Sequence, residues 1–158
     1  FAEPFCPHLR GLVAGAVRKA GGTVHEGGTF ITIEGPRFST RGESLIYRSW
    51  GVDIIGMTAV PEAQLAREAE ICYATLAHVT DYDVWHEEEE AVNVEMLIAN
   101  LMANAALTKR SIAELVPMLG DERPCDCSQA LSTAMITQRD LIPRSKIEEL
   151  GPIVARYF

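Results

Sequence analysis

Apolar residues recur along this chain with two alternating periods, and these periods predict its elements. Helical spacing covers residues 7–20, where Gly21-Gly22 ends the run, and it recurs over 41–50 and 91–115. A further helix is predicted to open at Pro61, because proline suits the first position of a helix. The pattern therefore predicts four helices before the less regular stretch that follows Gly120.

Shorter runs rich in β-branched residues lie between these helices. Residues 23–26 and 29–33 are separated by Gly27-Gly28, a pattern typical of a hairpin. The apolar runs 52–57 and 72–82 predict two further strands, each buried in a sheet. Residues 23–26 and 29–33 are therefore expected to be adjacent in the sheet as well as in the sequence.

Helices and strands thus alternate, which indicates an α/β domain with a mixed central sheet flanked by helices. The helix at Pro61 is expected to turn Leu65 and Ala69 to one face. With 158 residues, of which 47% are hydrophobic, the chain is long enough for one domain with a sizeable core.

Charge narrows the choice of partners. The net charge is −8, the isoelectric point is near 5.0, and no basic stripe gathers the 14 Lys and Arg residues. Nucleic acid and anionic membranes are therefore disfavoured, and a small molecule is expected. No apolar run approaches the roughly 18 residues of a membrane span, and no signal peptide is evident, so a cytoplasmic protein is expected.

The sequence VTDYDVW, residues 79–85, follows an apolar run with two acids that flank one aromatic residue. On a strand, Asp81 and Asp83 would point to the same face, about 6–7 Å apart. Ligands collect where strands end in such sheets, so this segment is a candidate binding site for a hydrogen-bond donor. The loops 34–40 and 57–60 are candidates for the same reason.

Each candidate residue also has a structural interpretation. Phe38 could fill the core, Thr58 could cap the helix that opens at Pro61, and either aspartate could be a turn or N-cap residue. Both kinds of interpretation stay open at this point.

Long stretches of the chain resemble a known family. TFITIEGPRFSTRGES and YRSWGVDIIGMTAVPEAQLAREAEICYATLAHVTDYDVWH are similar to the C-terminal half of the 5′-methylthioadenosine phosphorylases, within the trimeric purine nucleoside phosphorylase family. The resemblance runs from AEPFCP to about Ala106, and beyond Gly120 the CDC segment is similar to the CxC of some thermophile members. It implies that residues 1–158 are the C-terminal portion of a single nucleoside phosphorylase domain, without the N-terminal part of its sheet.

The resemblance also implies roles for individual residues. Phe38 lies against the purine, Met57 lies along the ribose hydroxyls, and Thr58 touches phosphate. Asp81 and Asp83 face the purine edge, with Asp81 as the catalytic residue.

Two further positions, Ser39 and Val94, correspond to those that help decide which substrate fits. The implied reaction is phosphorolysis of S-methyl-5′-thioadenosine to adenine and 5-methylthioribose 1-phosphate, with phosphate as cosubstrate and no organic cofactor. The implied assembly is a homotrimer or a dimer of trimers.

The residue types suit this chemistry. A carboxylic acid at N7 keeps the leaving purine from becoming a free anion, and such assistance is typically worth roughly 10²–10⁴-fold. Beside a second carboxylate in a water-poor pocket, one of the two acids is expected to keep its proton near neutral pH. The other is an acceptor, which suits the exocyclic amine of adenine.

Two alternatives remain. A purine nucleoside phosphorylase with broader specificity is disfavoured by Asp81, where an asparagine would indicate 6-oxopurines. A truncated, non-catalytic module of the same fold is the other alternative. In the family much of the phosphate site comes from the N-terminal half, so we expect that half to lie upstream of Phe1. Arg37 and Arg41 could bind the anion instead, although structural ion pairs are expected for them.

Metal binding is not expected from the sequence. The acidic run Glu87–Glu90 fits a solvated helix start. Cys125 and Cys127 lack a second close cysteine pair to complete a zinc site. A disulfide within CDC, or between Cys6 and Cys72, stays open.

Overall fold

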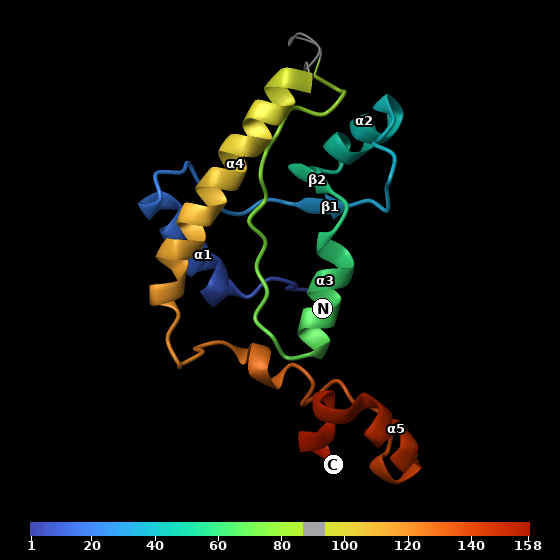
Figure 1. Ribbon diagram of the computed structural model, residues 1–158. Helices are drawn as coiled ribbons and strands as arrows, with labels where there is room; N and C mark the ends of the chain where they lie inside the picture. Colours follow the sequence, from blue (N-terminus) through green and yellow to red (C-terminus); the bar gives the residue numbers. More distant parts are fainter. Residues whose placement is uncertain (87–93) are drawn as a thin grey trace.

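The protein is described here by a computed structural model, which covers residues 1–86 and 94–158 (Figure 1). Its helices and strands are α1 (Pro7–Lys19), β1 (Phe30–Thr32), α2 (Arg41–Ser49), β2 (Ile54–Gly56), α3 (Ala59–Glu68), α4 (Val94–Leu115) and α5 (Arg144–Leu150). Short 3₁₀ turns occupy Val116–Met118, Asp126–Gln129, Arg139–Leu141, Gly151–Ile153 and Ala155–Tyr157. The α/β class predicted from the sequence is confirmed.

The sheet of the described residues has two strands, which run parallel. Phe30 lies opposite Ile54, Ile31 opposite Ile55, and Thr32 opposite Gly56. Parallel strands need a crossover connection, and α2 supplies it. The carboxyl ends of both strands therefore lie at the same edge, from which the loops before α2 and before α3 leave.

The predicted hairpin is wrong. Residues 23–26 form no strand, and the backbone oxygen of Thr29 accepts hydrogen bonds from the N–H groups of Asp53 and Ile54, at 2.9 and 3.2 Å. The Asp53 carboxylate also accepts from the Thr29 N–H, at 2.6 Å. Gly27 and Gly28 adopt positive φ, +87° and +115°, within a stretch that has no regular secondary structure. The run 29–33 therefore pairs with the strand that follows α2, and not with residues 23–26.

The strand predicted over 72–82 is also not formed. The segment is extended and passes between α4 and α3 (Figure 1), but its backbone groups bind side chains of α4 and not a neighbouring strand. The amides of Asn100 and Asn104 donate to the carbonyls of Thr80 and Val79, at 3.2 and 3.4 Å. Val79 is 68% exposed, so the expected deep burial is wrong as well.

Helix α1 packs along α4. Pro7 stands at the start of α1, and Val17 on its inner face is buried. Gly22, just past the end of α1, lies against the side chains of Val17 and Leu107. Helix α4 is described from Val94 onward, and its predicted start near Ala91 lies outside the described residues. Residues 87–93, which include the acidic run Glu87–Glu90, lie outside the described residues.

Helix α3 buries a different face from the one predicted. Ala59 and Ala63 are buried, whereas Leu65 is 61% exposed. Val60 departs from helical geometry, with φ −99° and ψ 59°, because a residue before proline is kept out of the helical region. Alanines, and not the larger Leu65, form the buried face, which the spacing of the larger apolar residues could not indicate.

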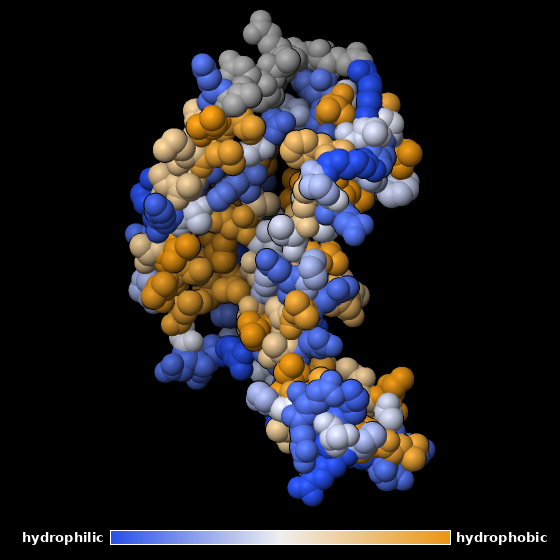
Figure 2. Space-filling view, turned by 45° about the vertical axis from the view of Figure 1, so that its right-hand side comes forward, coloured by the Kyte–Doolittle hydropathy of each residue, from blue (hydrophilic) through white to orange (hydrophobic). Residues whose placement is uncertain are grey.

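The buried apolar side chains are few and mostly small. They are Cys6, Ala14, Ala16, Val17, Ala59, Ala63, Cys127 and Val154. Large apolar side chains are exposed instead, among them Trp50, Met102 and Ile136, and orange atoms cover much of the face in Figure 2. Extended exposed apolar surfaces of this kind mark sites of interaction with protein, membrane or ligand. Within the described residues, no helix combines the length and apolar character needed to cross a bilayer.

Candidate active site

Two loops that leave the same sheet edge meet directly. A Cβ atom placed on Gly35 would lie 2.6 Å from the Met57 sulfur, and Gly35 has φ +68°, so both space and backbone geometry require glycine there. The first loop carries Phe38 and Ser39, and Thr58 follows Met57. The structure therefore brings these predicted site residues to one edge of the sheet.

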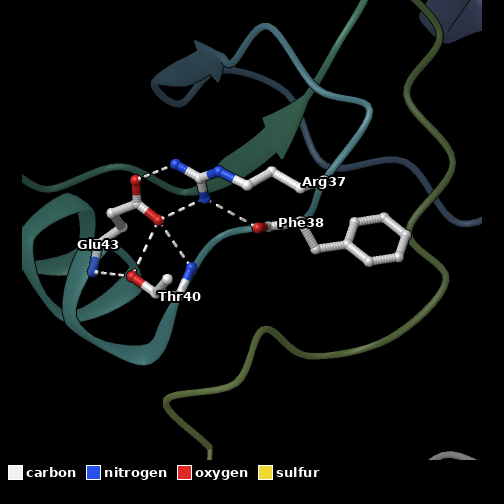
Figure 3. A network of polar contacts seen from close by, with 4 residues as sticks. All are labelled: Arg37, Phe38, Thr40 and Glu43. Atoms are coloured by element: carbon white, nitrogen blue, oxygen red, sulfur yellow. Dashed lines mark hydrogen bonds and ion pairs between the residues drawn. The ribbon is translucent and has the colours of Figure 1, made fainter.

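A network of polar contacts sets the shape of the first loop (Figure 3). The Arg37 guanidinium binds both oxygens of Glu43, at 2.6 and 2.8 Å, and donates to the Phe38 carbonyl at 3.1 Å. The Thr40 hydroxyl accepts from the Glu43 N–H, and the Glu43 carboxylate accepts from the Thr40 N–H at 2.7 Å, which forms a capping box for α2. The structural ion pair expected for Arg37 is confirmed.

The same network leaves the Phe38 side chain uncovered. Its ring is 84% exposed and points away from the Arg37–Glu43 pair (Figure 3). The interpretation of Phe38 as a core residue is therefore wrong for this chain. An exposed ring on a loop whose backbone is fixed offers a flat face for stacking.

Glu43 titrates far below its usual range in this arrangement. The hydrogen bonds from Arg37, and then those from Thr40, lower the pKa of Glu43 from 4.5 to about 2. Because the folded pKa is depressed, the stabilisation from this carboxylate is present above pH 4.5 and is lost as the pH falls through about 2. The cap of α2 is therefore expected to keep its charge in mild acid.

We expect carbon NMR of the Glu43 carboxyl to show a titration midpoint near pH 2. In Arg37→Met, which removes the largest cause of the shift, the midpoint should move toward 4.5. An unchanged midpoint in the variant would mean that the Thr40 contacts alone hold the charge.

Asp83 is held against α2. One of its oxygens accepts from the Ser44 hydroxyl at 2.6 Å, and the other accepts from the Val84 N–H at 2.9 Å. Ser44 is only 1% exposed, and Arg48, one turn further along α2, stacks on the Trp85 ring at 3.5 Å from its centroid. These contacts fix the VTDYDVW segment beside α2.

Ser44 is a positioning residue that was not predicted from the sequence. Its available signal was weak: a serine one turn before Arg48, on the helix face that also carries Tyr47. Ser44, Asp83 and Trp85 line a small cavity of about 40 Å³ together with residues of β2. The cavity places the segment next to β2 as well as α2.

Asp81 has different surroundings from Asp83. It is exposed and accepts a hydrogen bond from the Thr80 hydroxyl at 2.5 Å. The prediction that both carboxylates share one face rested on a strand at 72–82, and because that strand is not formed, its premise does not hold. The chain bends at Asp81 and turns again at 84–85.

The remaining candidate residues of the predicted site are Thr58, Met57, Ser39 and Val94. Thr58 is exposed and stands at the N-cap of α3, but its side chain makes no capping hydrogen bond. Its hydroxyl is thus not used by the helix, contrary to the structural interpretation. Met57 and Ser39 are half-buried. Val94 is the first residue of α4, and only its backbone is described.

A larger groove, of about 1370 Å³, lies elsewhere. It is open and separates α3 from the C-terminal turns, with Leu65, Ile136 and Phe158 among its lining residues. None of the predicted site residues lines it. The groove therefore lies apart from the candidate active site.

The four cysteines meet at a separate point of the structure. Their sulfur atoms all lie within 4.8 Å of one another, and all four are free thiols. The disulfides considered from the sequence, within CDC or between Cys6 and Cys72, are not formed. The inference that Cys125 and Cys127 lack a second pair is wrong in space, because folding brings Cys6 and Cys72 to them.

Comparison with known proteins identifies relatives along the whole chain. Residues 1–116 match the model of the phosphorylase superfamily. The S-methyl-5′-thioadenosine phosphorylase of Koribacter versatilis is 46% identical over 158 residues, and that of Geobacter sulfurreducens is 49% identical over 157. These matches cover 100% and 99% of this chain but 54% and 55% of the relatives, so the chain spans about half of their length.

Solved structures agree with these matches. A methylthioadenosine phosphorylase from an Antarctic soil metagenomic library superposes with a TM-score of 0.88 at 42% identity, over 96% of this chain and 54% of the other. The methylthioadenosine phosphorylase of Schistosoma mansoni, in complex with adenine, superposes with a TM-score of 0.74 at 35% identity, over 90% of this chain and 56% of the other. On the sequence match and the shared nucleoside phosphorylase fold, this chain belongs to the phosphorylase superfamily.

Proposed function

We propose that the gene product containing this chain cleaves S-methyl-5′-thioadenosine with phosphate, releasing adenine and 5-methylthioribose 1-phosphate. The observation that carries the proposal is the meeting of the Gly35 and Met57 loops at one sheet edge, because these two loops carry an exposed ring, a thioether and a hydroxyl. The relatives named above, which are 46% and 49% identical to this chain over the residues that align with it, support the same reaction.

Each residue takes a role that its chemistry suits. The exposed Phe38 ring stacks on the purine, and Met57, flexible and polarizable, packs along the sugar. Ser39 and Val94 help decide which substrate fits. All of these contacts come from uncharged side chains.

The two aspartates take the polar edge of the base. Asp83, which is anchored by Ser44, accepts the exocyclic amine. Asp81, which is exposed and bonded to the neighbouring Thr80, supplies a proton at N7 as the glycosidic bond breaks. A protonated leaving purine lowers the barrier, because no free purine anion has to form.

The phosphate site is assigned only in part to this chain. The hydroxyl of Thr58, at the start of α3, donates to phosphate, and the helix N-terminus favours an anion there. The other phosphate ligands are assigned to the half of the relatives' length that this chain does not span. The reaction uses phosphate as cosubstrate without an organic cofactor, in a cytoplasmic homotrimer or dimer of trimers.

The test is release of adenine from S-methyl-5′-thioadenosine by the full-length gene product, with and without phosphate. Phosphate-dependent release is expected, and the 158 residues by themselves should give none, because most of the phosphate ligands are assigned elsewhere. Release without phosphate would instead indicate hydrolysis. No release under either condition would favour the non-catalytic module.

The second candidate is a purine nucleoside phosphorylase with broader specificity. Aspartate at position 81 favours 6-amino purines, because an asparagine there would offer an amide donor to the carbonyl of a 6-oxo purine. Comparing kcat/KM for S-methyl-5′-thioadenosine, adenosine and inosine decides between the two. A higher value for inosine would support the broader enzyme.

A further inference from the structure

Three segments far apart in the sequence bring their cysteines together. Cys6 is the N-cap of α1, Cys72 follows α3, and Cys125 and Cys127 flank the start of the 3₁₀ turn Asp126–Gln129. The Cys6 N–H donates to the Tyr73 carbonyl at 2.7 Å, which ties the first two segments together next to the sulfur atoms. The cluster is thus assembled by tertiary structure.

The spacing of the sulfur atoms fits a single metal ion. Zinc binds thiolate sulfur at about 2.3 Å, so a tetrahedral site has sulfur atoms about 3.8 Å apart. Here all four lie within 4.8 Å of one another, and the sulfur atoms of Cys72 and Cys125 are 3.5 Å apart. Small side-chain rotations would bring every pair to the tetrahedral distance. Disulfide bonds would need a much closer approach, of about 2.05 Å.

The surroundings favour a closed site. Cys6 and Cys127 are 1% and 4% exposed, and Cys72 and Cys125 are half-buried. The Leu9 N–H at the start of α1 donates to the Cys6 sulfur at 3.4 Å, a contact that orients the sulfur and stabilises negative charge on it. Four sulfur ligands, without an oxygen or imidazole among them, select a soft ion over magnesium or calcium.

We propose that Cys6, Cys72, Cys125 and Cys127 form a structural tetrathiolate site for one Zn²⁺ ion. All four positions of the tetrahedron are filled by protein, so the ion has no open position for a substrate and takes no part in catalysis.

The ion would fasten the C-terminal segment to the rest of the chain. That segment lies at one end of the molecule, around α5 (Figure 1), and Glu70 also holds it. The Glu70 carboxylate accepts from the Leu131 N–H at 3.0 Å and pairs with Arg156 at 2.6 Å. Cys72 lies two residues beyond Glu70, so the proposed site and this ion pair secure the same junction.

The test uses the full-length gene product, expressed with zinc in the medium and purified without chelator. Elemental analysis is expected to find about one zinc per chain. Alkylation under denaturing conditions without reductant should then label all four cysteines. Replacement of the metal by Co²⁺ should produce the strong visible absorption of a tetrahedral thiolate complex.

Variants separate the site from incidental binding. Cys72→Ser and Cys125→Ser, at the two half-buried positions, should reduce the zinc content several-fold. Asp126→Asn is the matched control, because it removes an exposed carboxylate between two of the ligands and should keep the metal. Zinc loss in Asp126→Asn, with retention in both serine variants, would overturn the tetrathiolate assignment.

The wild-type protein provides an independent test if the serine variants fail to fold. Reduced, metal-free protein is titrated with Zn²⁺ and is expected to bind one equivalent tightly. Absence of binding, or two disulfides in protein purified without oxidant, would contradict the proposal. Both outcomes leave the proposed phosphorolysis unaffected, because that reaction is measured separately at the other site.

Discussion

Asp81→Asn in the full-length gene product is expected to lower turnover of S-methyl-5′-thioadenosine by roughly two orders of magnitude, the low end of what general acid assistance supplies. The amide cannot give up a proton to N7. It does offer an N–H donor that can face a carbonyl, so the ratio of inosine to adenosine cleavage should rise. Measuring kcat/KM for both nucleosides tests the two effects together.

Stability provides the control for this experiment. Asp81 is exposed and bonded to the adjacent Thr80, so the substitution should change the unfolding free energy by no more than about 0.5 kcal/mol. A lowered melting temperature with an unchanged substrate ratio would indicate a turn or cap residue. An equal loss on both nucleosides would leave Asp81 as an acid without a role in base selection.

Ser44→Ala distinguishes the two aspartates. It removes the hydroxyl that holds Asp83 while leaving the acid at Asp81 unchanged. If Asp83 binds the exocyclic amine, KM for adenosine should rise more than kcat falls, because the lost contact positions the base. The opposite pattern would assign the proton transfer to Asp83.

Gly22→Ala is expected to lower the free energy of unfolding by about 1–3 kcal/mol, the usual cost of overpacking. A Cβ atom there would lie 2.7 Å from a methyl group of Val17 and 2.9 Å from one of Leu107. Both neighbours belong to the contact between α1 and α4, so their side chains must change rotamer or the two helices must move apart. The measurement is denaturant unfolding of the full-length gene product.

Gly11→Ala is the matched control in the same region. Gly11 lies inside α1, and a Cβ atom there meets nothing within 4 Å. Alanine should stabilise the helix by about 0.5–1 kcal/mol, because glycine loses more backbone entropy on folding. Equal effects of the two substitutions would show that the junction of α1 and α4 is loosely packed.

Local patterns in the sequence determined several features of this protein. Pro7 and Gly21-Gly22 delimited α1, and the helical spacing over 41–50 located α2 to within a residue. The glycine pair at 27–28 separated the two β-rich runs, and both glycines adopt the positive φ that other residues avoid. These features depend on backbone dihedral preferences within a few residues, which the sequence states directly.

The resemblance to the 5′-methylthioadenosine phosphorylases located candidate residues that periodicity could not assign to a ligand. Phe38, Met57 and Thr58 were chosen for that reason, and the structure places their loops together. The structure also distinguishes the two aspartates, which the local sequence pattern treated as equivalent. Asp83 is anchored by Ser44, whereas Asp81 is exposed, because the predicted strand that would have aligned them is not formed.

Tertiary structure alone decided which distant segments meet. Residues 30–32 pair with 54–56 and not with 23–26, α3 buries alanines and not Leu65, and the four cysteines come from three segments. The physical reason is common to all three. The spacing of apolar residues indicates which side chains avoid water. It does not indicate the partner, many residues away, on which a sheet hydrogen bond, a close helix contact or a shared sulfur cluster depends.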